Sequence, residues 1–450
     1  MPDVVQGEKR MSNYADERSN GVKMNSPSVE LNLNVRGLSS SATVAINERS
    51  NQLIKEGRNI YKLGLGQSPF PVPNRVVEAL QNNAHQKDYL PVKGLLELRQ
   101  SVADHHQRAF DIECSADDVL IGPGSKELMF LLQLAYYGDL VVPAPSWVSY
   151  VPQAKIIGRH IRSLLTTAEN NWLLTAQQLD DCCRPDPDRP RVLILNYPSN
   201  PTGRTYSRDL LQELAEVARK YRMVVLSDEI YGKINHEDEH HSIVPFYPEG
   251  TVFSSGLSKW CGAGGWRLGL FVFPTCMRWL LNSMSVIASE TFTSTSAPIQ
   301  YAAITAFQEH EDLDAYLFQS KRILKALGGM LYNILKQGNV DVPEPQGAFY
   351  LFPTFNAQTE KLRSRGISTS DIFCERLLEE TGVAILPGTQ FGIPQADLTV
   401  RLAYVNFDGA AALAAAETIP SDQPLTDDFI HKQCPETIAG VQRLVDWVNA

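Results

Sequence analysis

The fold is decided by residues 191 to 232, which read RVLILNYPSNPTG at 191–203, RDLLQELAEVARKYR at 208–222 and MVVLSDEIYG at 223–232. The two outer segments contain short, uninterrupted apolar runs, which predict strands buried on both faces of a sheet. The middle segment is predicted to be a helix. A strand, a helix and a second strand in this order predict two parallel strands joined by a right-handed crossover.

The same alternation extends on both sides of this stretch. DVLIGPGS at 118–125 runs into the helical segment KELMFLLQLAYYG at 126–138, and LVVPAPSWVSY at 140–150 and TVFSSGLSK at 251–259 are further strand-like segments that end in polar loops. Alternating strands and helices predict an α/β fold with a mainly parallel sheet between helices.

Two composition changes suggest a division into domains. The first 30 residues are polar and mixed in charge, which predicts a flexible arm, and the sequence changes character again near residue 335. We expect the segment before about residue 85 to pack with the tail in a smaller α+β domain. The expected units are the arm at 1–30, the N-terminal part of the small domain at 31–85, a large domain at 86–334 and the C-terminal small domain at 335–450.

Bulk composition excludes several classes of protein. The formal net charge of the 450 residues is −10, and an acidic surface disfavours nucleic acid as a partner. No run of 18 apolar residues is present, so no membrane span is expected, and the N-terminus lacks the apolar region of a signal peptide. The seven cysteines are scattered, which favours reduced thiols and, by default, a cytoplasmic location. No metal site is predicted.

Ionisable side chains follow the predicted strands at the sheet edge where α/β proteins bind ligands. Asp228 directly follows a buried apolar run, and a carboxylate at such a place needs a partner, such as a protonated ring nitrogen. A helix N-cap is the alternative for Asp228. Lys259 follows a cluster of small hydroxyl residues, and a desolvated lysine there would act as a nucleophile toward an aldehyde. The alternative is an ordinary exposed lysine.

Two other segments suggest an anion site. Gly124, Ser125 and Lys126 form a glycine turn that opens a helix, where free N–H groups and the helix dipole favour phosphate. Arg267 follows a glycine-rich segment and can form charge-assisted bonds to the same group. A plain tight turn remains the alternative for the glycines.

Two residues are candidates for contacts with a planar ring. Trp147 follows a strand beside prolines, where it can stack on a ring or serve as a core residue. Asn200 lies in NYPSNPTG, where its amide can donate to a ring oxygen or belong to a turn.

The combination NYPSNPTG, SDEIYG, SxxSK and GWRLG resembles the class I/II aminotransferases, which are fold-type-I enzymes dependent on pyridoxal 5′-phosphate (PLP). The resemblance extends from about residue 35 to 450. It implies a large PLP-binding domain with a mainly parallel seven-stranded sheet between helices, plus a smaller α+β domain. It also implies a homodimer with shared active sites.

The resemblance assigns a role to each cofactor-binding candidate. Lys259 matches the lysine that holds PLP as a Schiff base and then moves a proton on the substrate. Asp228 matches the carboxylate that pairs with the ring nitrogen, while Tyr231 and Asn200 match the donors to the ring oxygen. Trp147 matches the aromatic residue that stacks on the ring. The residues that match phosphate ligands are Gly124, Ser125, Lys126, Arg267 and, from the neighbouring subunit, Tyr89.

The same resemblance suggests how substrate is held. Arg401, in LTVRLAY, matches the arginine that clamps the substrate α-carboxylate, and Gly66 matches a loop glycine near that carboxylate; Trp147 and Asn200 also belong to the substrate site. The position three residues before the lysine, which is often a phosphate-binding serine in relatives, is Gly256 here. We expect Ser258 to replace it, with Ser255 as the second choice.

The implied activity is transfer of an α-amino group from an L-amino acid to a 2-oxo acid. A PLP-dependent C–S β-lyase or an enzyme resembling aminocyclopropane-carboxylate synthase is the alternative, since one fold supports several reactions. A binding protein without activity is disfavoured by the complete set of ligands. The hydroxyl-rich segment around Ser294 favours neutral or aromatic substrates. By the same resemblance, the Ala144–Pro145 and Asn200–Pro201 bonds are expected to be cis.

Overall fold

The computed structural model describes residues 31–38, 42–237 and 239–450. The arm predicted at 1–30 therefore lies outside the described residues. The described residues 31–37 belong to a unit of their own, and they contain a turn in which Asn32 O accepts from Val35 N and Arg36 N. Everything from Leu38 to Ala450 belongs to a second unit, which contains all the elements below.

The second unit is built on the expected seven-stranded sheet. Its strands in spatial order are β2 (Val119–Gly122), β8 (Gly269–Val272), β7 (Thr251–Gly256), β6 (Val224–Asp228), β5 (Arg191–Asn196), β3 (Asp139–Ala144) and β4 (Ile161–Leu165). Strand β8 is antiparallel to both neighbours, and the remaining pairs are parallel. This confirms the predicted α/β fold class.

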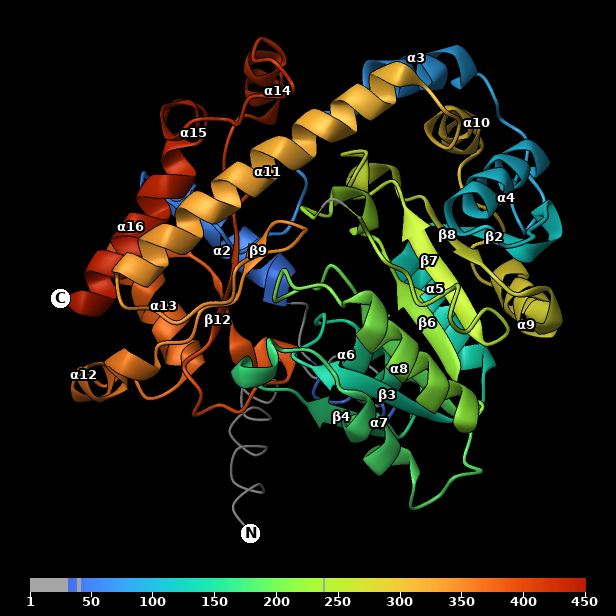
Figure 1. Cartoon of the computed structure of the whole chain (residues 1–450), viewed down its shortest axis with the longest axis horizontal. Coiled ribbons are helices and arrows are strands. Elements are labelled where there is room, and N and C mark those ends of the chain that lie inside the picture. The colour runs from blue at the N-terminus through green and yellow to red at the C-terminus, as the bar shows by residue number, and fades with distance from the viewer. Residues whose placement is uncertain (1–30, 39–41, 238) are drawn as a thin grey trace, which may run out of the picture. The chain divides into compact units, whose positions relative to one another are not determined.

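Helices cover both faces of this sheet, as Figure 1 shows. On one face, Val192 and Ile194 of β5 pack with α5, α6 and α9, whereas Leu193 and Leu195 point to the other face and pack with α7 and α8. This alternation explains why the strands read as continuous apolar runs, since both faces are buried. The helices of this part of the chain are α3 (Asn74–Asn83), α4 (Leu96–Phe110), α5 (Ser125–Ala135), α6 (Tyr150–Ile156), α7 (Ala176–Cys183), α8 (Arg208–Lys220), α9 (Arg278–Ser289) and α10 (Ala297–Ala306).

The remaining elements form two small sheets and a group of helices. The parallel pair is β1 (Tyr61–Lys62) with β10 (Val383–Ala384), and the antiparallel sheet has the order β11 (Leu386–Pro387), β12 (Val400–Ala403), β9 (Tyr350–Leu351). The helices are α2 (Ala42–Lys55), α11 (Glu311–Gln337), α12 (Thr359–Ser364), α13 (Ser370–Thr381), α14 (Gly409–Glu417), α15 (Asp427–Gln433) and α16 (Pro435–Asn449). The β1–β10 pair thus joins the early segment to the tail.

Three details refine the sequence predictions. Ala144–Pro145 is cis as expected, but the expectation for Asn200–Pro201 was wrong, because the second cis bond is Tyr197–Pro198, three residues earlier in the same loop. No described helix is long and apolar enough to cross a membrane. Within the described ranges, no group of three or more His, Cys, Asp or Glu side chains is arranged to hold a metal ion.

Candidate active site

Polar side chains from successive strand ends surround a cavity of about 300 Å³ at the carboxyl edge of β5, β6 and β7. This is the edge at which open α/β sheets bind ligands. The sequence-predicted residues that line it are Gly66, Ser125, Lys126, Trp147, Asn200, Asp228, Tyr231, Ser258, Lys259 and Arg267.

Asp228 is the last residue of β6 and is only 2% exposed. The Tyr150 hydroxyl donates to its Oδ2 at 2.5 Å, and the Ser254 hydroxyl donates to Oδ1 at 3.4 Å. Burial raises the pKa of Asp228 to about 6, although the bonds from Tyr150 and Ser254 act in the opposite direction. A cation placed against this carboxylate would therefore be bound strongly and would keep it ionised.

Lys259 lies three residues beyond the end of β7, and its Nζ donates to the Gly66 carbonyl at 2.7 Å. Burial, together with the positive charge of Arg401, lowers the pKa of Lys259 to about 8. A lysine with this pKa is partly neutral near physiological pH, so it can act both as a nucleophile and as a base. Gly66 has to be a glycine, because a Cβ there would lie 2.0 Å from the Tyr350 hydroxyl.

The start of α5 forms an anion cradle. Gly124 has φ +93°, and a Cβ there would lie 2.3 Å from Nη2 of Arg267, so only glycine brings the helix this close to the guanidinium. No side chain caps α5, which leaves its first N–H groups facing the site that Ser125 and Lys126 line. Burial, together with the charge of Arg267, lowers the pKa of Lys126. The cradle concentrates donors and positive charge as a phosphate group requires.

Arg401 is connected to the cavity by a hydrogen bond to Asn200, which lines it. It is buried in β12, and its Nη1 donates to Asn200 Oδ1 at 3.0 Å, while its Nη2 donates to the Gly64 carbonyl. Because Asn200 Oδ1 accepts from Arg401, the amide NH₂ of Asn200 is the group left to donate toward the cavity. Beside this pair, the Tyr231 and Tyr350 hydroxyls are hydrogen-bonded at 2.7 Å.

Two predicted residues lie elsewhere. Tyr89 is 91% exposed in the loop between α3 and α4 and does not line the cavity of its own chain. Ser255 lines a different cavity, beside His106 and Phe253, whereas Ser258 lines the candidate site. Ser258 therefore shares a cavity with Ser125, Lys126 and Arg267, and its role as a phosphate ligand stays a prediction.

Sequence reasoning missed three residues around Asp228. They are Tyr150 and Ser254, which bond its carboxylate, and Asn196, whose Nδ2 donates to the Asp228 carbonyl at 2.9 Å and whose Oδ1 accepts from Asn200 N at 2.8 Å. Asn196 is the last residue of β5 and pairs with Asp228 in the sheet. Its position at a strand end was the sequence feature from which its place in the site could have been predicted.

Comparison with known proteins identifies the family. A sequence model of "Aminotransferase class I and II" matches residues 58–417. The chain belongs to this family. The aminotransferase is 33% identical over 402 residues to the aspartate aminotransferase of Geobacillus stearothermophilus, covering 85% of this chain and 95% of the relative. It is 31% identical to the aspartate aminotransferase of Bacillus sp. (strain YM-2), covering 82% and 93%.

A solved structure supports the same assignment. The aspartate aminotransferase from Thermus thermophilus with maleate superposes with a TM-score of 0.77 at 28% identity, covering 86% of this chain and 97% of that one. The lyase expected as an alternative has no support in these similarities.

We predict that Tyr150→Phe in the aminotransferase moves the acid limb of the pH–activity profile to higher pH. The hydroxyl lowers the pKa of Asp228, so its removal lets the carboxylate take up a proton at a higher pH. A bond to a charged group contributes roughly 1.5–3 kcal/mol, so kcat/KM should fall about tenfold or more. Steady-state kinetics from pH 5 to 9 (roughly the range in which such groups titrate) measure both effects. Tyr206→Phe is the control, because the Tyr206 hydroxyl accepts from Leu174 N instead of bonding Asp228. If the acid limb of the pH–activity profile stays in place in Tyr150→Phe, the assignment of that limb to Asp228 is contradicted.

Proposed function

We propose that this aminotransferase binds PLP in the cavity at the carboxyl edge of β5, β6 and β7, joined covalently to Lys259. Three features of the cavity fit three parts of the cofactor. The uncapped start of α5, with Lys126 and Arg267, fits the phosphate; buried Asp228 fits a protonated ring nitrogen; and the lysine of lowered pKa fits the aldehyde. The carboxylate of Asp228, buried with no ion pair among the residues that the structure describes, is the single observation that carries the proposal.

The other contacts complete the cofactor site. Tyr231 and Asn200 would donate to the ring oxygen, Trp147 would stack on the ring, and Ser125 and Ser258 would add hydroxyl donors for the phosphate. When bound, PLP supplies an aldehyde that condenses with amines and a protonated ring that stabilises negative charge on the substrate Cα.

The chain's own residues then carry the proton chemistry. Arg401 binds the α-carboxylate of the substrate in a charge-assisted pair, which fixes the Cα next to Lys259. With a donor amino acid bound, the neutral Lys259 Nζ would take the proton from its Cα, and with the 2-oxo acid acceptor bound it would deliver a proton to the Cα of the new amino acid. Asp228 remains ionised throughout and holds the proton on the ring nitrogen.

The amino donor we propose to test first is L-aspartate. Relatives named aspartate aminotransferase support this choice, and the solved relative that carries maleate holds a dicarboxylate. The hydroxyl-rich segment around Ser294 favours neutral or aromatic donors instead. A panel of ¹⁵N-labelled L-aspartate, L-alanine and L-phenylalanine with 2-oxoglutarate separates these choices, because ¹⁵N should appear in glutamate from the preferred donor. Failure of every donor, with PLP added, would contradict the proposal.

We further propose the assembly and the domain division. A homodimer in which the exposed Tyr89 reaches the phosphate of the neighbouring subunit would explain why this tyrosine lies outside its own site. The β1–β10 pair supports a small domain formed from residues 31–85 and 335–450, with 86–334 as the PLP-binding domain. Seven free cysteines are compatible with the proposed cytoplasmic location.

The pKa of Lys259 predicts how uptake of PLP depends on pH. Only the neutral amine attacks the aldehyde, so the uptake rate of the apoprotein should rise about tenfold per pH unit at low pH and level off above about pH 8. Stopped-flow absorbance after mixing apoprotein with PLP measures this rate. Reaction of PLP with N-acetyl-lysine is the control, since an ordinary lysine titrates near 10.4 and its rate keeps rising. A protein rate that also rises to that pH would show that Lys259 is not desolvated.

A further inference from the structure

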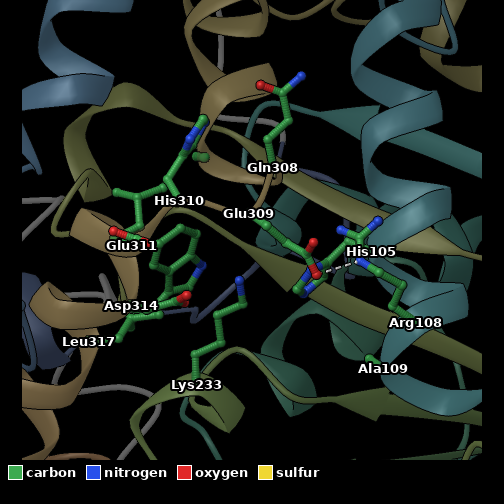
Figure 2. A pocket seen from close by; sticks show the side chains of 13 residues that line it. His105, Arg108, Ala109, Lys233, Gln308, Glu309, His310, Glu311, Asp314 and Leu317 are labelled. Atoms are coloured by element: carbon green, nitrogen blue, oxygen red, sulfur yellow. Dashed lines mark ion pairs between the residues drawn. The ribbon is translucent and has the colours of Figure 1, made fainter.

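A second cavity, of about 490 Å³, is lined in part by Trp260, the residue that follows the active-site lysine. Figure 2 shows it between the end of α4, the short helix η4 (Gly232–Ile234) and the start of α11. We call it the Lys233 cavity and define it by His105, Arg108, Lys233, Trp260, His310 and Asp314. None of these residues lines the candidate active site.

The inner part of the Lys233 cavity contains donors that lack acceptors. The Lys233 Nζ lies 4.3 Å from the centre of the Trp260 ring and has no hydrogen bond or ion pair with the residues that the structure describes. Trp260 is 1% exposed, and its Nε1–H is buried without a partner within the same ranges, as is Nε2 of His310. Buried donors are costly when unpaired, so these groups favour a ligand that brings an anionic acceptor.

The outer part of the cavity carries the opposite charge. Arg108 is already paired with Glu309, with 3.0 Å between Nε and Oε1. Asp314 and Glu311, exposed in the first turn of α11, have no ion pair among the described residues. These carboxylates would repel a dianionic phosphate ester, but they would attract an ammonium group on a ligand whose anionic end lies deeper.

We propose that the Lys233 cavity binds a free α-amino acid, with its carboxylate on Lys233 Nζ and Trp260 Nε1 and its ammonium group toward Asp314 and Glu311. Burial lowers the pKa of Lys233 to about 8, and a bound carboxylate would raise it again. The cavity thus offers a partner of opposite sign for each charge of a zwitterion. This site is distinct from the active site, so the inference goes beyond the proposed function.

Two residues of the Lys233 cavity are close in sequence to active-site residues. Trp260 directly follows Lys259, and Lys233 follows Tyr231 by two residues. A ligand that moves Lys233 away from the Trp260 ring therefore acts on the chain next to two active-site groups. Binding of an amino acid in the Lys233 cavity would therefore be felt at the active site.

Calorimetric titration of the holoenzyme tests the proposal. Borohydride reduction first fixes the cofactor on Lys259 and stops turnover, and L-alanine, L-glutamate and L-phenylalanine are then titrated separately. At least one of the three should bind once per chain. Lys233→Met should weaken this binding at least tenfold, because it removes a charge-assisted bond. Lys336→Met, at an exposed lysine paired with Asp341, should leave it unchanged.

Two further variants keep the test decisive. Trp260→Phe keeps an aromatic side chain but removes the Nε1 donor, so it should weaken binding roughly three- to tenfold. This variant decides the matter if Lys233→Met does not fold. Arg401→Gln should leave the binding intact, since Arg401 belongs to the active site. The proposal is overturned if none of the three amino acids binds to the reduced protein, if binding survives both cavity variants, or if binding is lost in Arg401→Gln.

Discussion

Replacing Lys259 by alanine is expected to lower kcat for amino-group transfer by at least about a thousandfold, because one side chain acts as both nucleophile and base. The Nζ is buried, bonds the Gly66 carbonyl and has a pKa lowered to about 8 by burial. Within the described residues that line the cavity, Lys126 is the other lysine, and it belongs to the anion cradle. No other lysine among the described lining residues is therefore available for the two roles proposed for Lys259.

Two measurements separate this loss from a loss of folding. Peptide mass spectrometry after borohydride reduction should find the cofactor on the peptide containing Lys259 in the wild type and on no peptide of Lys259→Ala. Thermal unfolding should show that the variant is at least as stable, because removal of a buried ammonium relieves a desolvation cost. A Lys259→Ala protein within tenfold of the wild-type kcat would contradict the assignment.

The second large effect is expected for Asp228→Asn, which keeps the shape of the side chain but removes its charge. The hydroxyl of Tyr150 can still donate to the amide oxygen, so folding should survive. The ring nitrogen loses its buried counter-ion, and truncation of one partner of such a pair costs roughly 2–5 kcal/mol. We expect kcat to fall about 100- to 1000-fold.

The division between kcat and KM tests whether Asp228 acts on the cofactor. The substrate carboxylate is assigned to Arg401, which bonds Asn200 and not Asp228. In Asp228→Asn, kcat should therefore fall while KM for the amino acid changes little, and retention of PLP on dialysis should weaken. Arg401→Gln is the matched comparison, in which KM should rise instead. A raised KM with unchanged kcat in Asp228→Asn would contradict its role at the ring.

The sequence predicted those site residues that follow strands directly. Asp228 ends β6, and Asn200 and Lys259 follow β5 and β7 within a few residues, so the parallel sheet brings them to one edge. The identity of the lysine and its cofactor came from the resemblance of motifs and not from this geometry. The seven-stranded sheet was likewise implied by the resemblance, and the apolar runs alone predicted only its parallel part.

Contacts between distant segments could not be predicted in the same way. Tyr150 lies 78 residues from Asp228 in the chain, and Arg401 lies 201 residues from Asn200, so both bonds depend on how helices and loops pack. The cis bond expected at Asn200–Pro201 occurs at Tyr197–Pro198. The sequence could not distinguish the two bonds, because both precede a proline in the same short loop. Gly66 was predicted to lie near the substrate, but its bond to Lys259 required the loop and the strand end to meet.

The central claim is that this aminotransferase moves an amino group through PLP bound at Lys259. Its most direct test is the half-reaction of the PLP-loaded protein with L-aspartate alone, or with the preferred donor, followed by absorbance and by quantification of 2-oxo acid and ammonia. The account predicts loss of the visible absorption of the bound cofactor, formation of about one 2-oxo acid per chain, no ammonia, and full recovery of the absorption when 2-oxoglutarate is added. Continuous release of ammonia without an acceptor, or no visible absorption after loading with PLP, would contradict it.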